Sequence, residues 1–127
     1  MAESAPYDDG DGGSVPDDGW CVTIDNFSGT DYTVTAYALC VKDLGGLTYV
    51  DKRSKAPASA RLDQTVKCPK GEKVIGGGLE TDGGGGVGAL VTSRHSITDA
   101  SDRVWDTALD NDDFVKVPVT SYAICHR

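Results

Sequence analysis

Residues 20–40, WCVTIDNFSGTDYTVTAYALC, recur almost entirely at residues 105–125, WDTALDNDDFVKVPVTSYAIC. Both stretches fit the pattern W-x4-D-N-x7-V-T-x-Y-A-x-C without a gap, and eight of their 21 positions are identical. An ungapped match of this length indicates an internal repeat, and a repeat constrains the fold more strongly than any single motif. We therefore expect two equivalent halves in the structure.

Each copy reads as two strands joined by a turn. In the first copy, residues 20–26 and 32–41 have the β-branched and aromatic content of strands, and residues 27–31 supply the turn. The second copy has the same layout in residues 104–111 and 115–126. We expect each copy to form a hairpin.

The rest of the chain also favours strands over helices. Residues 47–53 and 89–93 are further candidate strands, whereas residues 54–62, SKAPASARL, read as an exposed connection. The 16 glycines, with only two Phe and one Met, suit short strands and tight turns. The predicted fold class is all-β: a two-sheet antiparallel sandwich of about seven to nine strands with an approximate internal two-fold repeat.

A glycine-rich strand lies between the two copies. The stretch 64–79, QTVKCPKGEKVIGGGL, contains a Cys-Pro-Lys-Gly turn and then a strand that runs into Gly76-Gly77-Gly78. Glycines inside a strand indicate a bulge, or another backbone or ring packed directly on it. Trp20 and Trp105 are the candidate rings.

The chain divides into an acidic arm at residues 1–19 and a β domain at residues 20–127. The arm, MAESAPYDDGDGGSVPDDG, carries −6 of the net charge of −8 and leaves −2 for the remainder. Its composition is that of a flexible segment, and its carboxylates lack the spacing and the closing Glu of an EF-hand calcium loop. We expect the arm to reach a neighbouring subunit. Its candidate assembly residues are Tyr7, Asp8, Asp9 and Asp11.

The charge distribution and hydropathy exclude some partners. An acidic tail on a nearly neutral body argues against nucleic acid, which is bound through a basic face. No apolar run is long enough for membrane insertion. The first residues lack the basic start and apolar middle of a signal peptide, so either the mature chain has been trimmed or the protein leaves its cell by another route, such as lysis. The expected location is a virion or the extracellular space.

The four cysteines are Cys21, Cys40, Cys68 and Cys125. No Cys-x-x-Cys spacing or neighbouring histidine pair supports zinc, so two disulfides are expected outside a reducing cytosol. Three pairings are possible. A hairpin at 20–40 would favour Cys21–Cys40 with Cys68–Cys125, and buried free thiols are the alternative.

The candidate catalytic and ligand-binding residues are weak. Ser93, His95, Ser96, Asp99 and Asp102 permit a Ser-His-Asp arrangement on paper, but no nucleophile elbow is present, so a polar loop is favoured. Asp110, Asp112 and Asp113 could share a cation. However, Asp110-Asn111 repeats Asp25-Asn26 before a turn, where such side chains cap the backbone. We expect no enzyme activity, no cofactor and no metal.

The glycine loop at residues 81–88 formally matches a dinucleotide-binding fingerprint. Its candidate binding residues are Asp82, Gly83, Gly85 and Gly88. That fingerprint requires a following helix, whereas the strand-like sequence ALVTS follows here. A loop that presents a binding surface is the remaining functional interpretation.

The combination of VTAYALC, V-x-CPKG-x-x-VIGGG and W-x-x-x-L-x-N followed by VTSYAIC resembles a group of small β-rich domains. These domains are common in secreted proteins of actinobacteria and in tail and surface proteins of their phages. The resemblance covers residues 20–126, and Cys21 departs from the pattern. It implies an extracytoplasmic, non-catalytic module that is appended or displayed, and it carries over no catalytic residue.

The expected function is that of a non-enzymatic structural protein displayed on a phage particle, as a capsid decoration or tail-associated protein. Its partners would be neighbouring subunits, either copies of itself or capsid and tail proteins, reached through the N-terminal arm. The alternative is a secreted module that recognises a cell-surface glycan or protein through the 81–88 loop and exposed aromatics. Trp20, Trp105, Tyr37 and Tyr122 could stack on sugars, although their duplication suits core or sheet-packing positions better.

Overall fold

The computed structural model describes residues 2–8, 15–24, 26, 28–40, 44–81, 88–96 and 100–127. Within these ranges the chain forms eight strands and no helix. The strands are β1 (Ala2–Tyr7), β2 (Gly19–Ile24), β3 (Thr48–Ala56), β4 (Ala60–Lys67), β5 (Lys73–Thr81), β6 (Gly88–His95), β7 (Val104–Asn111) and β8 (Val117–His126).

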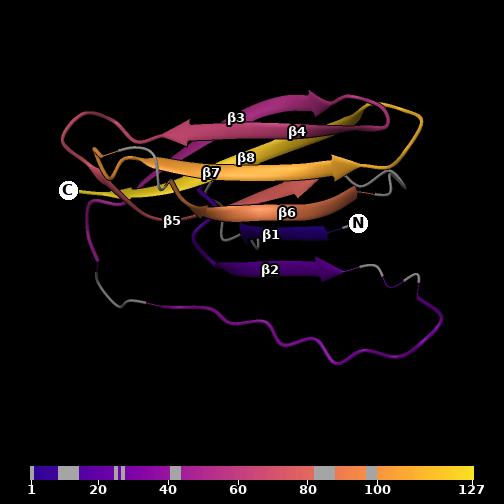
Figure 1. The fold of residues 1–127 in the computed structure, drawn as a ribbon. Helices are drawn as coiled ribbons and strands as arrows, with labels where there is room; N and C mark the ends of the chain where they lie inside the picture. The colour runs from indigo at the N-terminus through magenta and orange to yellow at the C-terminus, as the bar shows by residue number, and fades with distance from the viewer. Residues whose placement is uncertain are drawn as a thin grey trace.

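The strands form two antiparallel sheets that pack face to face (Figure 1). One sheet has five strands in the order β2-β1-β5-β8-β3, and the other has three in the order β4-β7-β6. Two buried clusters fill the space between them, one around Val66 and Val74 and the other around Leu79 and Leu109. The predicted antiparallel sandwich is confirmed.

The second copy of the repeat spans the two sheets. β7 pairs with β4 and β6 in the three-stranded sheet, whereas β8 pairs with β3 and β5 in the five-stranded sheet. The predicted hairpin at 105–125 is therefore wrong, because its two strands face each other across the core. The hydroxyls of Thr107 and Ser121, both buried, lie 2.7 Å apart and join the two strands there.

The N-terminal residues form a strand. β1 pairs with β2 from Ala2↔Ile24 to Tyr7↔Gly19 and meets β5 at Ser4↔Leu79. Ala5 is fully buried. These residues therefore belong to the protein's own sheet and do not form a flexible arm, and the small side chains of Ser4 and Ala5 allow β1 to lie against glycine. A Cβ built at Gly78 would stand 2.9 Å from Ala5 Cα. Asp9 and Asp11 lie outside the described residues.

The glycine run in β5 behaves as its sequence indicates. The register between β5 and β8 shifts between Val74 and Gly76, which is the expected bulge. At Gly77 a Cβ would lie 2.6 Å from Cδ1 of Trp105, so only glycine leaves room for this ring. Both expectations for this stretch are confirmed, and Trp105 is the ring that packs on it.

The region expected to be an exposed connection, residues 54–62, belongs mostly to strands. Ser54 to Ala56 end β3, and Ala60 to Leu62 begin β4. Ala56 is fully buried, although the low hydropathy of SKAPASARL predicted that these residues would be exposed. Only residues 57–59 turn, and Ser59 adopts a positive φ of 49° where the chain crosses between the sheets.

One disulfide closes the core. Cys68, directly after β4, is bonded to Cys125 of β8, with 5.7 Å between their Cα atoms. This predicted pairing is confirmed. The pairing of Cys21 with Cys40 is wrong, because β2 pairs with β1 and Cys40 lies on a segment apart from both sheets.

Candidate functional site

The two copies of the repeat build the same turn. In the first copy Asn26 Oδ1 accepts from Ser28 N (3.0 Å), and Asn26 Nδ2 donates to Thr30 O (2.6 Å). In the second copy Asn111 Oδ1 accepts from the amide N two residues later (3.1 Å), and Asn111 Nδ2 donates to Val115 O (2.9 Å). The predicted capping role of these asparagines is confirmed.

The copies also share a strand pair before the turn. Trp20 Nε1 donates to Ser4 Oγ, and Trp105 Nε1 donates to Ser93 Oγ, each over 3.0 Å. The register agrees as well, because each serine lies opposite the residue two places after its tryptophan. The pair β1–β2 is thus equivalent to β6–β7, which extends the repeat beyond the match seen in sequence.

After the turn the copies part. In the second copy the chain continues as β8, a central strand in which Val119 is 2% exposed and Cys125 is fully buried. In the first copy residues 30–40 form no strand, and all of them are exposed. We call these residues the exposed segment. Its equivalent of Val119 is Val34, which is 53% exposed, and Leu39 is completely exposed.

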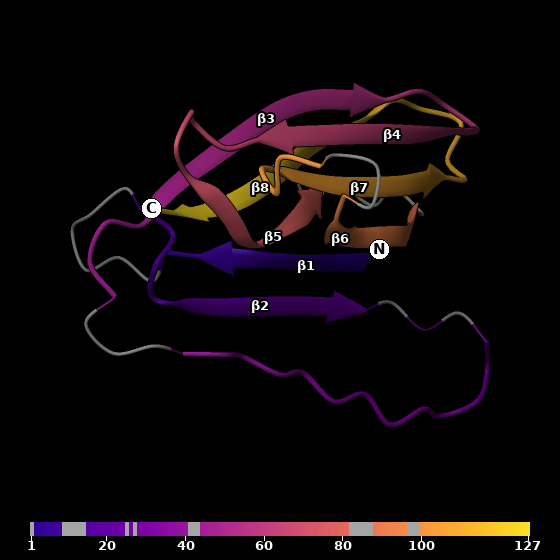
Figure 2. The same cartoon turned by 60° about the vertical axis from the view of Figure 1, so that its left-hand side comes forward.

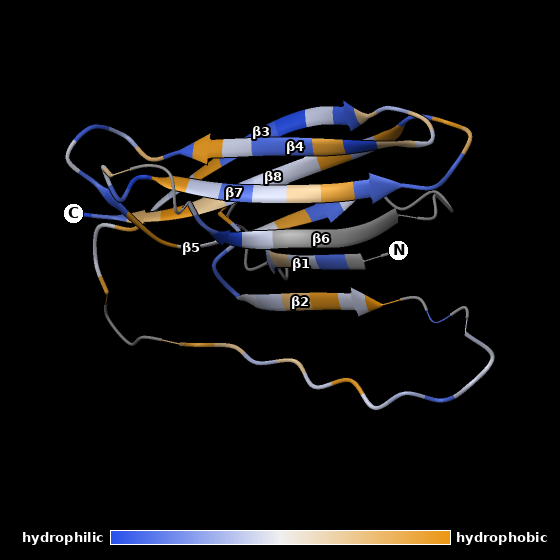
Figure 3. Ribbon diagram, in the orientation of Figure 1, coloured by the Kyte–Doolittle hydropathy of each residue, from blue (hydrophilic) through white to orange (hydrophobic). Residues whose placement is uncertain are grey.

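The exposed segment runs apart from the two sheets, beyond β2, in both views of the fold (Figure 1, Figure 2). Figure 3 shows hydrophobic stretches along it. Between Tyr32 and Cys40 the sequence has no charged residue. The segment therefore combines the composition of a buried strand with full contact with water, which is unfavourable for a monomer.

The neighbours of β8 show what the exposed segment lacks. β8 lies between β3 and β5, and β7 pairs with β4 on one side, so all three of these neighbours come from residues 48–81. The first copy has no such partners within the described part of the chain. There, β2 is an edge strand of its sheet, with its second side unpaired.

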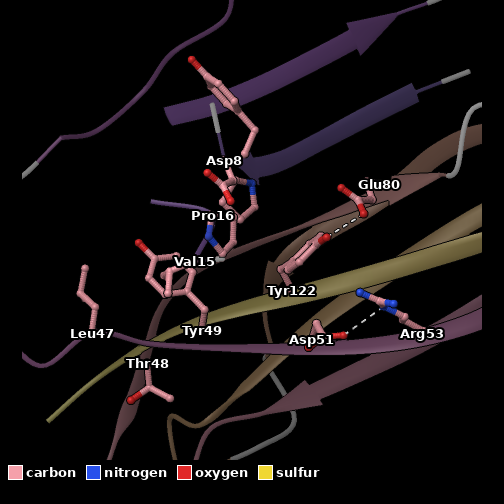
Figure 4. A pocket seen from close by; sticks show the side chains of 12 residues that line it. Asp8, Val15, Pro16, Leu47, Thr48, Tyr49, Asp51, Arg53, Glu80 and Tyr122 are labelled. Carbon is pink, nitrogen blue, oxygen red and sulfur yellow. Dashed lines mark hydrogen bonds and ion pairs between the residues drawn. The ribbon is translucent and has the colours of Figure 1, made fainter. Parts of the chain in front are cut away.

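A second candidate site is a hollow of about 690 Å³ on the outer face of the five-stranded sheet. We call it the outer hollow; Figure 4 shows its lining. Strand alternation places Tyr49, Asp51 and Arg53 of β3 on this face, with Tyr122 of β8 directly opposite Asp51. Its aromatic and charged lining residues are Tyr7, Asp8, Tyr49, Asp51, Arg53, Glu80 and Tyr122.

Several polar groups of the outer hollow interact with one another. Tyr122 OH donates to Glu80 Oε1 over 2.7 Å (Figure 4), and partial burial together with this bond raises the pKa of Tyr122. Burial, and to a lesser degree Asp17, raises the pKa of Tyr49. Asp51 and Arg53 form an exposed ion pair over 3.5 Å. Protonated phenols next to carboxylates suit a neutral polyol, whose hydroxyls both donate and accept hydrogen bonds.

Ser93, His95 and Asp102, the candidates for a Ser-His-Asp arrangement, make other contacts in the structure. Ser93 Oγ accepts from Trp105 and lies 3.5 Å from the carbonyl oxygen of Gly77. His95 Nε2 lies 3.9 Å from Asp102, whose carboxylate also pairs with Lys73 over 3.5 Å. Asp99 is outside the described residues. Ser93 therefore positions the indole ring of Trp105.

The remaining predicted site residues lie mainly in the glycine loop. Asp82, Gly83 and Gly85 fall outside the described residues, and Gly88 begins β6. Within the described ranges, no three His, Cys, Asp or Glu residues come together as metal ligands. Nor do those ranges contain a helix with the length and apolar character needed to cross a membrane.

Comparison with known proteins finds no match to the chain. No protein-family model matches it, and neither a curated protein nor a solved structure does. The resemblance to actinobacterial and phage β domains thus stays an expectation based on sequence motifs.

Sequence reasoning missed both candidate sites, although signals for each were present. The outer hollow could have been found from the alternation of Tyr49, Asp51 and Arg53 along one strand face. The sequence before each copy could have indicated that residues 30–40 are exposed. The second copy is preceded by residues 48–81, which supply its neighbours β3, β4 and β5, whereas residues 1–19 contain no stretch of this kind.

Proposed function

We propose that this protein is a non-enzymatic structural component of an extracellular particle, a phage capsid decoration or tail-associated protein, that joins its neighbours by strand pairing. The observation that carries the proposal is the exposed segment, a copy of β8 that has the sequence of a central strand and no strand to pair with among the described residues. An unpaired strand offers its backbone N–H and C=O groups to another chain, which is a recurrent mode of protein assembly.

Two further features support the proposal. The Cys68–Cys125 disulfide closes a long stretch of chain, and bonds of this kind persist in oxidising surroundings outside the cell. The resemblance of the sequence motifs to those of displayed actinobacterial and phage domains favours a particle surface. Because β1 is part of the protein's own sheet, the proposed assembly element is the exposed segment rather than the N-terminal arm.

Density-gradient sedimentation of the protein from its native source, with immunodetection across the fractions, tests this function. We expect the protein to migrate with particles after a high-salt wash. The Thr35→Pro variant should not migrate with particles, because proline removes a backbone donor in the middle of the exposed segment. Thr35→Ala keeps that donor and should remain attached. Recovery of the wild-type protein only at the top of the gradient would contradict the proposal.

The outer hollow favours a second candidate function, recognition of a cell-surface glycan by a secreted module. Tyr7, Tyr49 and Tyr122 supply aromatic surface, and Asp51 and Glu80 supply acceptors for sugar hydroxyls. A glycan array followed by calorimetry tests it. Binding that is lost in Tyr49→Ala and retained in Tyr37→Ala would support this function, since Tyr37 lies on the exposed segment and not in the hollow.

A further inference from the structure

We infer that β1, β2 and the exposed segment are one half of a second sandwich, and that the partner completing it is a polypeptide of the same kind as residues 48–81, with a vacant place for a last strand. This inference rests on the proposed function, because it names the neighbour that the exposed segment would join. The half present here corresponds to β6, β7 and β8.

The equivalence of the two halves is structural as well as sequential. Both have the tryptophan-to-serine hydrogen bond of 3.0 Å, the same register between their first two strands, and the same asparagine-capped turn. These features use only β1, β2 and the turn after β2 in the first half and β6, β7 and the turn after β7 in the second, and they form in both. The exposed segment begins after this turn, at the point where the equivalent strand β8 is packed against residues of β3 to β5.

The second copy shows what the missing neighbour supplies. Val119 of β8 packs with Ala56, Leu79 and Leu109, while Ala123 and Cys125 pack with Val66, Cys68 and Val74. Apart from Leu109 of β7, these contacts all come from residues 48–81, which span β3 to β5.

The equivalent residues of the exposed segment are Val34, Ala38 and Cys40, and all three are exposed. A partner that covers them needs apolar side chains at the same spacing and a cysteine facing Cys40. It also needs a glycine beneath Trp20, as Gly77 lies beneath Trp105.

A second copy of this chain meets these needs poorly. Its own β3–β5 stretch is already filled by β8, and its Cys68 is already bonded to Cys125. The exposed segment could enter it only after that strand had left and that disulfide had opened. A β3–β5-like polypeptide without its last strand offers the same contacts with an empty place and an available cysteine.

The proposed junction includes a covalent bond. The thiolate of Cys40 attacks the partner cysteine's sulfur, which is held as a mixed disulfide with glutathione. The protein–protein S–S bond forms, the mixed disulfide breaks, and the glutathione thiolate leaves and takes a proton from water. The mixed disulfide between glutathione and the partner cysteine is the oxidant, so one disulfide is consumed and one is formed.

The test uses the full chain with its native disulfide intact and a synthetic polypeptide of residues 44–81 as the probe. The probe is labelled with ¹⁵N, and its Cys68 carries glutathione. We expect mass spectrometry of a digest to find the labelled cysteine joined to Cys40. The bond should form roughly a hundredfold faster than with a Gly77→Val probe, because docking raises the local concentration of the two sulfur atoms.

The Gly77→Val probe is the matched control, since it keeps the cysteine and the charges but blocks the place required by Trp20. Cys40→Ser in the full chain provides a readout without the covalent bond. With the unaltered probe, amide hydrogen exchange at residues 33–39 should still slow in this variant. With the Gly77→Val probe it should not.

Three outcomes would overturn the inference. Equal rates with both probes would make Cys40 merely an accessible thiol. A labelled cysteine found on Cys125 would mean that the probe displaces the protein's own strands. A Cys40–Cys68 bond between two full chains without probe would identify the second copy as the occupant.

The inference and the proposed function can fail separately. A protein that sediments with particles but does not capture the probe keeps its function and loses this partner. A protein that captures the probe but stays at the top of the gradient keeps this partner class and is not a virion component.

Discussion

Residues 34–40 and 119–125 have nearly the same sequence and opposite surroundings. Val34 is 53% exposed and Val119 is 2% exposed, although each precedes a Thr and a Tyr-Ala pair at the same spacing. Tyr37 is 83% exposed, whereas Tyr122 is half-buried and bonded to Glu80. Strand propensity therefore describes a fit to neighbouring strands, and a sequence with this propensity stays irregular where those neighbours are absent.

The point at which the copies separate is informative in the same way. The turn at Asn26 and the bond from Trp20 to Ser4 need only nearby chain, and they match their counterparts in the second copy. The burial of β8 needs residues more than thirty positions earlier in the sequence. The turn and the strand pair before it are thus duplicated, whereas among the described residues only the second copy packs its last strand into the core.

Cys125 of the second copy is bonded to Cys68, whereas its equivalent Cys40 is free, so these cysteines should differ most in their effect on stability. Replacing both Cys68 and Cys125 by alanine should lower the free energy of unfolding by about 4 kcal/mol, because the bond closes a loop with a sequence separation of 57. Cys40→Ala should change it by less than about 0.5 kcal/mol, since Cys40 is exposed and free. Urea denaturation followed by tryptophan fluorescence measures both. A comparable loss in the Cys40 variant would show that the exposed segment is bonded in solution.

The equivalent valines Val119 and Val34 should differ by an intermediate amount in their contribution to stability. Val119→Ala removes two buried methyl groups from the core and should cost about 2 kcal/mol of unfolding free energy. Val34→Ala should cost less than about 0.5 kcal/mol, because its side chain already contacts water. Guanidinium denaturation of both variants is the measurement. Equal costs would mean that Val34 is packed against something under the conditions of the experiment.

The equivalent tyrosines Tyr122 and Tyr37 should differ least, in how they change the pH dependence of the free energy of unfolding. The raised pKa of Tyr122 means that the folded protein holds this proton more tightly than the unfolded chain. Its stabilising contribution is fully present below the ordinary tyrosine pKa of about 10 and is lost as pH rises above that value. The free energy of unfolding should therefore fall less steeply between neutral and alkaline pH in Tyr122→Phe than in the wild type. If Tyr37→Phe flattens the profile as much, the assignment to Tyr122 is wrong.

The sandwich could be predicted because its determinants are local and repeated. Alternating strands, glycine turns and the Gly76–Gly78 run indicated two packed sheets, a bulge and a ring on glycine, and the structure has all three. The Cys68–Cys125 pair was one of three possible pairings. It could be favoured only by assuming a hairpin at residues 20–40, and that hairpin does not form.

The misses have a common physical cause. Residues 2–7 and 54–56 were assigned to an arm and a connection because their composition is polar or small, yet Ala5 and Ala56 are fully buried. A small side chain adds little hydropathy but permits close approach, so composition underestimates its place in a core. Alternation along β3 shows that Tyr49, Asp51 and Arg53 share a face, but the pairing of β3 with β8 that completes the outer hollow has no local signal in the sequence.

The central position of β8 has a consequence for the order of folding. β8 follows the other described strands in sequence, so it leaves the ribosome after them, and until then the edges of β3 and β5 that it joins are open. The exposed segment is made earlier, has nearly the same pattern, and is tethered to β3 only by residues 41–47. Loop closure favours such a short tether, so the nascent chain carries its own rival for the place of β8. Formation of the native protein requires the later of two similar strands to exclude the earlier one.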